Sequence, residues 1–86
     1  MVKPYRFWDD AIIHVLGDAG CPLHYTELTE RILNKGYYQT NGKTPEMTVC
    51  RNLSQNKYNF YIQTEPGVYK LSNDGISEYQ KITKGI

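Results

Sequence analysis

The chain has 86 residues, of which 40% are apolar, and its formal net charge is +1. This length fits one small domain with a modest hydrophobic core. The balanced charge excludes a strongly basic tail and an acidic disordered chain, and no apolar run approaches the ~18 residues that span a membrane. We therefore expect a single globular domain that makes no contact with a membrane.

The cysteine content indicates an intracellular protein. A secreted domain of this size usually carries several disulfides, and this chain has only Cys21 and Cys50. We predict two reduced thiols, with one bridge as the less favoured alternative, and a location in the cytoplasm (with the nucleoid) or in the nucleus. His14 and His24 do not combine with these cysteines in a zinc-binding spacing, so we predict no metal and no cofactor.

A first helix is predicted over residues 7–19, where apolar side chains recur at helical spacing. Asp9 and Asp10 suit the positive end of its dipole, Gly20 is a typical C-terminal stop, and Pro22 prevents the helix from resuming. The predicted inner stripe consists of Phe7, Trp8, Ala11, Ile12, Val15, Leu16 and Ala19.

A second helix is predicted to begin near His24 and to end at Gly36. Leu23 and Leu28 stand at the two positions of a hydrophobic staple, and His24 is expected to cap the helix or to pack as a ring. The predicted inner stripe of this helix consists of Leu28, Ile32 and Leu33. Residues 37–43 then read as a polar loop.

A third helix is predicted over residues 44–56. Thr44 is the expected cap, Pro45 takes the first helical position, and Glu46 suits the first turn. Val49 and Leu53 share one face, which we expect to be buried. The opposite face carries Met47, Thr48, Arg51 and Gln55.

Two short β-prone runs follow, at residues 60–64 and 68–71, and Glu65-Pro66-Gly67 joins them as a tight hairpin. Leu23 is placed to pair with this hairpin as a strand of one or two residues. Ile76, Tyr79 and Ile82 predict a short fourth helix. We expect residues 1–72 to form the domain and residues 73–86 to form a C-terminal tail, either a short helix or a linker.

This order of elements is that of a winged helix-turn-helix. It is a small α+β fold of three helices and a two-stranded wing hairpin, here with a short C-terminal helix as an addition. In this fold the first helix packs across the other two, so that the third is free to enter a major groove with the hairpin beside it.

The second and third helices also resemble a known family, the HARE-HTH domain. The residues that carry the resemblance are Pro22-Leu23-His24-Tyr25-Thr26-Glu27-Leu28-Thr29, Ile32-Leu33, Gly36-Tyr37, Gly42-Lys43-Thr44-Pro45-Glu46 and Val49, with Phe60, Gly67-Val68-Tyr69 and Leu71 in the wing. The family occurs in Asx-like chromatin proteins, in the delta subunit of bacterial RNA polymerase and beside restriction endonuclease domains. The resemblance implies a DNA-binding adaptor, an accessory targeting domain in a restriction or chromatin and transcription system, which could sense base modification.

Charge is distributed unevenly along the chain. Residues 1–34 carry five acidic and three basic side chains, whereas residues 35–57 carry four basic side chains against Glu46 alone. Residues 58–86 are balanced. The excess positive charge therefore lies in the segment that would face DNA, where phosphate neutralisation needs it.

We predict that DNA contacts come from the third helix and the wing, with Arg51 suited to the O6 and N7 atoms of guanine. Lys43 at the helix start is suited to a phosphate, although an ordinary capped helix also explains this segment. Polar residues are also what any exposed helix face carries. We expect Tyr37 to be core, and Tyr38 is left open between core and backbone contact. The predicted DNA-binding residues are Lys43, Thr44, Thr48, Arg51, Asn52, Gln55, Lys57 and Lys70.

No catalytic motif is present in the sequence. A Gly-rich phosphate loop, a G-x-S-x-G elbow and an H-E-x-x-H zinc motif are all absent. We therefore predict a non-catalytic module whose partner is double-stranded DNA, with any nuclease or polymerase activity in a fused or associated protein. The alternative is a winged helix that docks a polymerase, nuclease or chromatin partner through the same faces.

Overall fold

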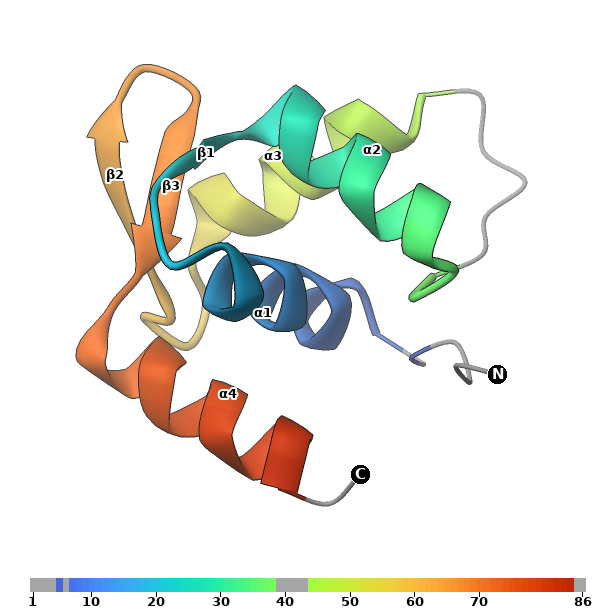
Figure 1. Ribbon diagram of the computed structural model, residues 1–86. Coiled ribbons are helices and arrows are strands. Elements are labelled where there is room, and N and C mark those ends of the chain that lie inside the picture. The colour runs from blue at the N-terminus through green and yellow to red at the C-terminus, as the bar shows by residue number, and fades with distance from the viewer. Residues whose placement is uncertain (1–4, 6, 39–43, 85–86) are drawn as a thin grey trace.

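The computed structural model describes residues 5, 7–38 and 44–84, and its elements follow the predicted order. Helix α1 (Trp8–Ala19) is followed by β1 (Leu23–His24), α2 (Tyr25–Lys35) and α3 (Pro45–Gln55). The hairpin strands β2 (Tyr61–Glu65) and β3 (Val68–Leu71) come next, and α4 (Asn73–Lys84) ends the described chain. Figure 1 shows α1 between α4 on one side and α2 with α3 on the other. The prediction of an α+β winged helix-turn-helix is confirmed.

Helix α1 is the centre of the molecule because other helices cover two of its faces. Its six residues from Ala11 to Leu16 are all buried, which a helix packed on only one side would not show. The face that includes Ile13 and Gly17 lies toward α4, where the ring of Tyr79 occupies the space that a Cβ on Gly17 would need. The fully buried apolar side chains of the core are Ile12, Ile13, Val15, Leu28, Ile32, Val49 and Leu53.

The sheet has three antiparallel strands in the order β1-β3-β2. Leu23 pairs with Tyr69 and His24 with Val68, so the predicted short strand at Leu23 is confirmed. Pro66 and Gly67 make the turn between the longer strands, and Gly67 has the positive φ of 78° that such a turn requires. The Tyr25 amide donates to the Gly67 carbonyl at 3.0 Å, which ties the turn to the start of α2.

Several expectations about the helix faces were wrong. Phe7 is 60% exposed because it is the residue before α1 and precedes the first turn. Leu33 is 38% exposed, since the buried face of α2 runs through Leu28, Thr29 and Ile32 instead. In α4 the buried residue is Gly75, with Tyr79 and Ile82 packed at the core, whereas Ile76 points outward.

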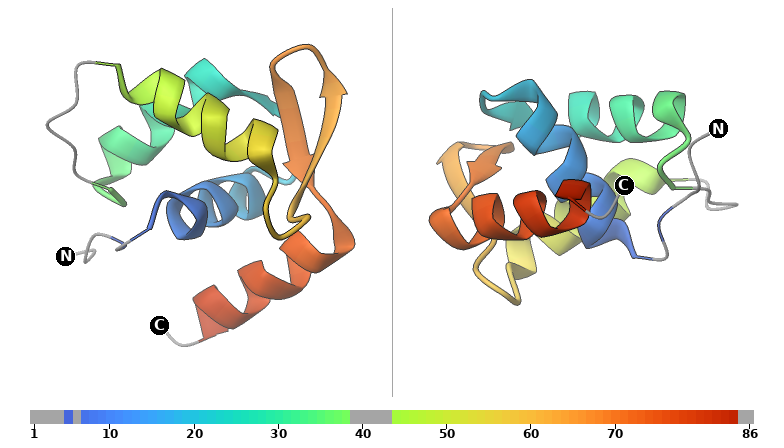
Figure 2. Two further views of the ribbon diagram at one scale, coloured as in Figure 1. Left: turned by 180° about the vertical axis from the view of Figure 1, so that it is seen from behind. Right: turned by 60° about the horizontal axis from the view of Figure 1, so that its bottom comes forward.

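Helix α4 is held at both its start and its middle. The Ser72 hydroxyl accepts a hydrogen bond from the Gly75 amide at 3.1 Å, as a cap does. One turn further, the Tyr79 hydroxyl donates to the Asp18 carboxylate of α1 at 2.6 Å, and this bond raises the pKa of Tyr79. The predicted short helix at the C-terminal end is thus confirmed as a helix that packs on α1, as the right view of Figure 2 also shows.

The start of α1 is joined to the sheet by a buried tyrosine. The hydroxyl of Tyr61 donates to the Asp9 carboxylate at 2.6 Å. Burial raises the pKa of Tyr61 well above its usual range, and Asp9 adds to the shift. The hydroxyl therefore stays protonated and acts as a hydrogen-bond donor at every pH at which the protein is folded.

Candidate nucleic-acid interface

Helices α2 and α3 form the helix-turn-helix, and the burial of α3 decides which of its faces is free. Val49 and Leu53 are fully buried against the rest of the core. At 100° per residue, the point directly opposite these two side chains is occupied by Arg51. Arg51 is exposed and has no salt-bridge partner among the described residues. Its guanidinium is therefore free to meet a ligand that approaches α3 from outside.

The other polar candidates on α3 flank Arg51. Gln55 is exposed one turn after it, while Thr48 and Asn52 are half-buried on the side of the helix away from Met47. Met47 itself is 58% exposed, so the outer face of α3 also presents an apolar contact. The arrangement offers hydrogen-bond donors and acceptors around one cation, which suits base edges in a major groove.

The start of α3 differs in detail from the expectation. Thr44 stands at the N-cap position and Pro45 at the first helical position, as predicted, but the Thr44 side chain makes no capping hydrogen bond. Instead the Thr44 carbonyl accepts from the Met47 amide at 3.1 Å. The exposed Thr44 hydroxyl is thus free of the helix end. Lys43 lies outside the described residues.

The link from α3 to the wing contains a residue that the sequence analysis missed. Asn56 ends α3 in the left-handed conformation, with φ of 45°. Its side-chain amide donates to the Tyr61 carbonyl at 2.8 Å, and its side-chain oxygen accepts from the Tyr61 amide at 3.1 Å. This pair of hydrogen bonds sets β2 at a defined distance from α3. The signal in the sequence was an asparagine directly after a helix, since asparagine tolerates this conformation.

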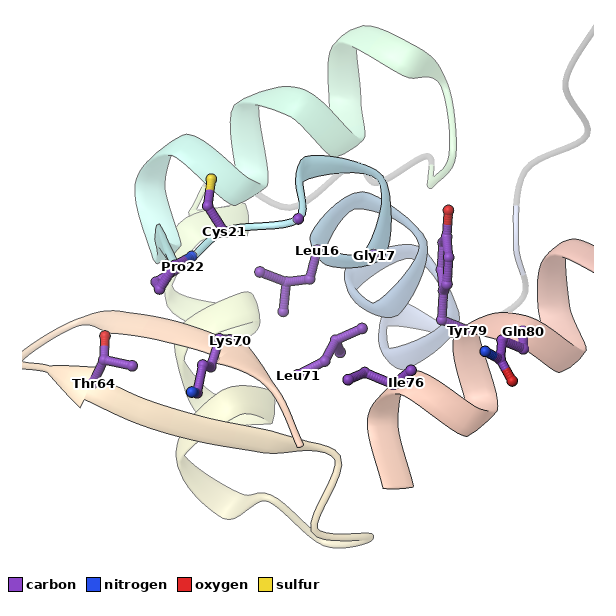
Figure 3. A pocket seen from close by; sticks show the side chains of 11 residues that line it. Leu16, Gly17, Cys21, Pro22, Thr64, Lys70, Leu71, Ile76, Tyr79 and Gln80 are labelled. Carbon is purple, nitrogen blue, oxygen red and sulfur yellow. The ribbon is translucent and has the colours of Figure 1, made fainter. Parts of the chain in front are cut away.

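The two lysines predicted at the wing lie in different surroundings. Lys57 is exposed just after α3, and its ammonium lies 5.5 Å from the ring centroid of Tyr58. Lys70 pairs with Ile62 in the sheet and points away from the buried Tyr69. Figure 3 shows it at a pocket between the hairpin, the end of α1 and α4, with Cys21, Leu71 and Ile76 among the other lining residues. The structure thus brings Lys57 close to α3 and places Lys70 toward α4.

The remaining candidates have structural roles. The His24 ring nitrogen accepts from the Thr26 amide at 3.2 Å, so the predicted cap is confirmed. Tyr37 is buried in the core as expected. Tyr38, which the sequence left open, stacks on Trp8 with ring centroids 4.0 Å apart.

The buried His14 is also occupied by structural contacts. The Tyr5 hydroxyl lies 2.8 Å from its Nδ1, Asp18 lies 3.4 Å from its Nε2, and Tyr37 stacks on the ring. Cys21 and Cys50 are free thiols. Within residues 5, 7–38 and 44–84, no three histidine, cysteine or acidic side chains gather closely enough to hold a metal ion. None of the helices in these ranges is long and apolar enough to cross a membrane.

The fold and the free face of α3 define the class of the protein as a winged helix-turn-helix domain. A comparison with protein families matches residues 6–72 to the model of HARE-HTH, a helix-turn-helix domain described by its occurrence in ASXL proteins and restriction endonucleases. The chain belongs to this family, as its second and third helices indicated. Comparisons with curated proteins and with solved structures found no match. The family implies a DNA-binding helix-turn-helix domain rather than a catalytic one.

Proposed function

We propose that the domain binds double-stranded DNA with α3 in the major groove and the β2–β3 hairpin as a wing along the backbone. The observation that carries the proposal is the position of Arg51, directly opposite the buried Val49 and Leu53 on a helix whose outer face is otherwise polar apart from Met47. A recognition helix needs this arrangement, because its inner face anchors it while its outer face reads bases.

Each predicted contact has its own role in this proposal. Arg51 reads guanine, and Thr48, Asn52 and Gln55 contact base edges or adjacent phosphates. Lys43 and Thr44 at the start of α3 and Lys57 at its end hold the backbone on either side. Lys70 reaches the backbone only if the DNA extends around the hairpin, because it lies on the face toward α4.

The charge distribution supports weak binding. Only four basic side chains lie between residues 35 and 57, and the rest of the chain is neutral or acidic. We therefore propose an accessory or targeting domain in a restriction or chromatin and transcription system. A tethered neighbour, such as a nuclease or a polymerase, would supply additional affinity and any catalysis.

A titration of labelled duplex with the protein across salt concentrations tests this function. We expect the logarithm of the affinity to fall linearly with the logarithm of the salt concentration, by a slope of about −0.9 for each phosphate contacted. A methylated and a plain duplex of one sequence should differ in affinity if the domain senses base modification. Equal affinities would remove that part of the proposal and leave DNA binding intact.

Docking of a protein partner is the second candidate, and exposed apolar side chains favour it. Met47 and the 38%-exposed Leu33 line a groove between α2 and α3. In this case a folded sample shows no duplex binding even at low salt, and substitution of Met47 abolishes capture of the partner.

A further inference from the structure

An aromatic pocket lies where the start of α1, the link between α3 and β2, and α4 meet. It has a volume of about 310 Å³ and is lined by Phe7, Tyr58, Phe60, Asp9, Asp10 and Glu78. Phe7 is 60% exposed and Tyr58 is 54% exposed. Three rings and three carboxylates thus line one small hollow, and none of them belongs to the outer face of α3.

The rings offer a platform rather than a closed core. Tyr58 and Phe60 lie with their centroids 5.4 Å apart and their planes inclined by 32°. Tyr58 already attracts a cation on this surface, since the ammonium of Lys57 lies 5.5 Å from its centroid. An aromatic face attracts cations through the negative charge above its ring.

The carboxylates at this pocket are not neutralised within the described part of the chain. Neither of the two ion pairs found there, His14 with Asp18 and Arg31 with Glu27, involves a carboxylate of the pocket. Burial raises the pKa of Asp10, and the charges of Glu78 and Asp9 raise it further. One oxygen of Asp9 accepts the Tyr61 hydroxyl, which leaves its second oxygen to face the pocket or solvent.

These features together select one kind of ligand. Among the described residues no three such side chains are close enough to chelate a metal ion, so the carboxylates are spaced for a larger cation. A planar guanidinium stacks on aromatic rings and donates to two carboxylates at once, which an ammonium does less well. The volume of the pocket also suits one side chain rather than a helix. We propose that this pocket binds an arginine side chain of a basic peptide segment in a protein partner.

The proposal separates two surfaces by charge. DNA is repelled by an acidic pocket, whereas a basic peptide is repelled by the positive face of α3. The domain is therefore able to hold DNA on α3 and a basic segment at this pocket at the same time. Binding at one surface should not compete with binding at the other.

Titration of the isotope-labelled protein with a glycine-serine peptide that contains two arginines tests the proposal. We expect amide shifts around residues 7–10, 58–60 and 78, and an affinity about tenfold lower for the double variant Asp10→Asn, Glu78→Gln. Tyr58→Leu, which changes no charge, should lower the affinity about threefold to tenfold through loss of the ring. The same peptide with lysines in place of arginines should bind more weakly.

A matched pair of substitutions controls for overall charge. Glu30→Gln with Glu65→Gln removes two exposed acidic groups outside the pocket and should leave peptide affinity within about twofold. Peptide binding that is absent in the wild type, unchanged in the pocket variants, or equally reduced in the control pair contradicts the proposal. Equal affinity for the lysine peptide overturns the assignment to a guanidinium. Duplex affinity that is retained in the pocket variants shows that the two binding activities are separate.

Discussion

Replacement of Arg51 by glutamate is expected to lower the affinity for duplex DNA by about 100-fold at constant salt. Arg51 occupies the point of α3 farthest from the buried face, so its side chain is the first to enter the groove. Glutamate at this position both removes a donor pair for guanine and places a negative charge against the phosphates. The stability of the fold should not change, because Arg51 is exposed and outside both ion pairs of the described residues.

The measurement is a fluorescence anisotropy titration of the two proteins with the same duplex. Lys81→Glu is the matched control, because it makes the same change in net charge on an exposed residue of α4, across α1 from α3 (Figure 1). We expect the control to cost less than about threefold. If both variants lose affinity equally, DNA is attracted by net charge alone and α3 is not the reading element.

Replacement of Gly75 by alanine is expected to destabilise the fold by about 2 kcal/mol. Alanine is a better helix former than glycine, and propensity alone predicts a gain of about 1 kcal/mol in α4. However, a Cβ on Gly75 would lie 2.2 Å from the backbone carbonyl oxygen of Phe60. A backbone atom cannot rotate away as a side chain does, so α4 or the start of β2 must move.

Thermal unfolding followed by circular dichroism measures this effect, and we expect the midpoint to fall by about 10 °C. Ser77→Ala is the control, because Ser77 is exposed on the same helix and makes no contact that alanine would lose. Its stability should change by no more than about 0.5 kcal/mol. A Gly75→Ala protein as stable as the wild type would show that α4 does not pack on the link before β2 as described.

The elements of the fold were predictable from the sequence because their end signals are local. Gly20 and Gly36 end their helices in the left-handed conformation, Pro45 opens α3, and Pro66-Gly67 make the hairpin turn. Such signals depend on the conformation of one or two residues. The pairing of Leu23 with the hairpin also followed, since the order of elements leaves that strand only one neighbour to pair with.

The side-chain environment was less predictable because it depends on packing between distant segments. Periodicity assigned Leu33 and Ile76 to buried faces, yet Thr29 and Gly75 are buried in these helices. Gly75 is buried because the link after α3 lies against it, which no local pattern in α4 reveals. The same holds for the bonds between Asn56 and Tyr61.

For the interface, the helical wheel was sufficient to place Arg51 and Gln55 outside, because Val49 and Leu53 define the inner face of α3. It was insufficient for Lys70, whose surroundings are set by the way α4 closes over the sheet. The pocket of three rings and three carboxylates also joins three segments, and no spacing along the chain indicates it.

The central claim is that the outer face of α3 is the surface that meets DNA. Mapping of amide chemical shifts in the isotope-labelled protein during titration with a short duplex tests it most directly. The account predicts that the largest shifts occur at residues 44–57 and in the hairpin, with residues 76–84 of α4 unaffected. Shifts that concentrate on α4 and the acidic pocket while α3 is silent, or no shifts at low salt in the folded protein, would contradict it.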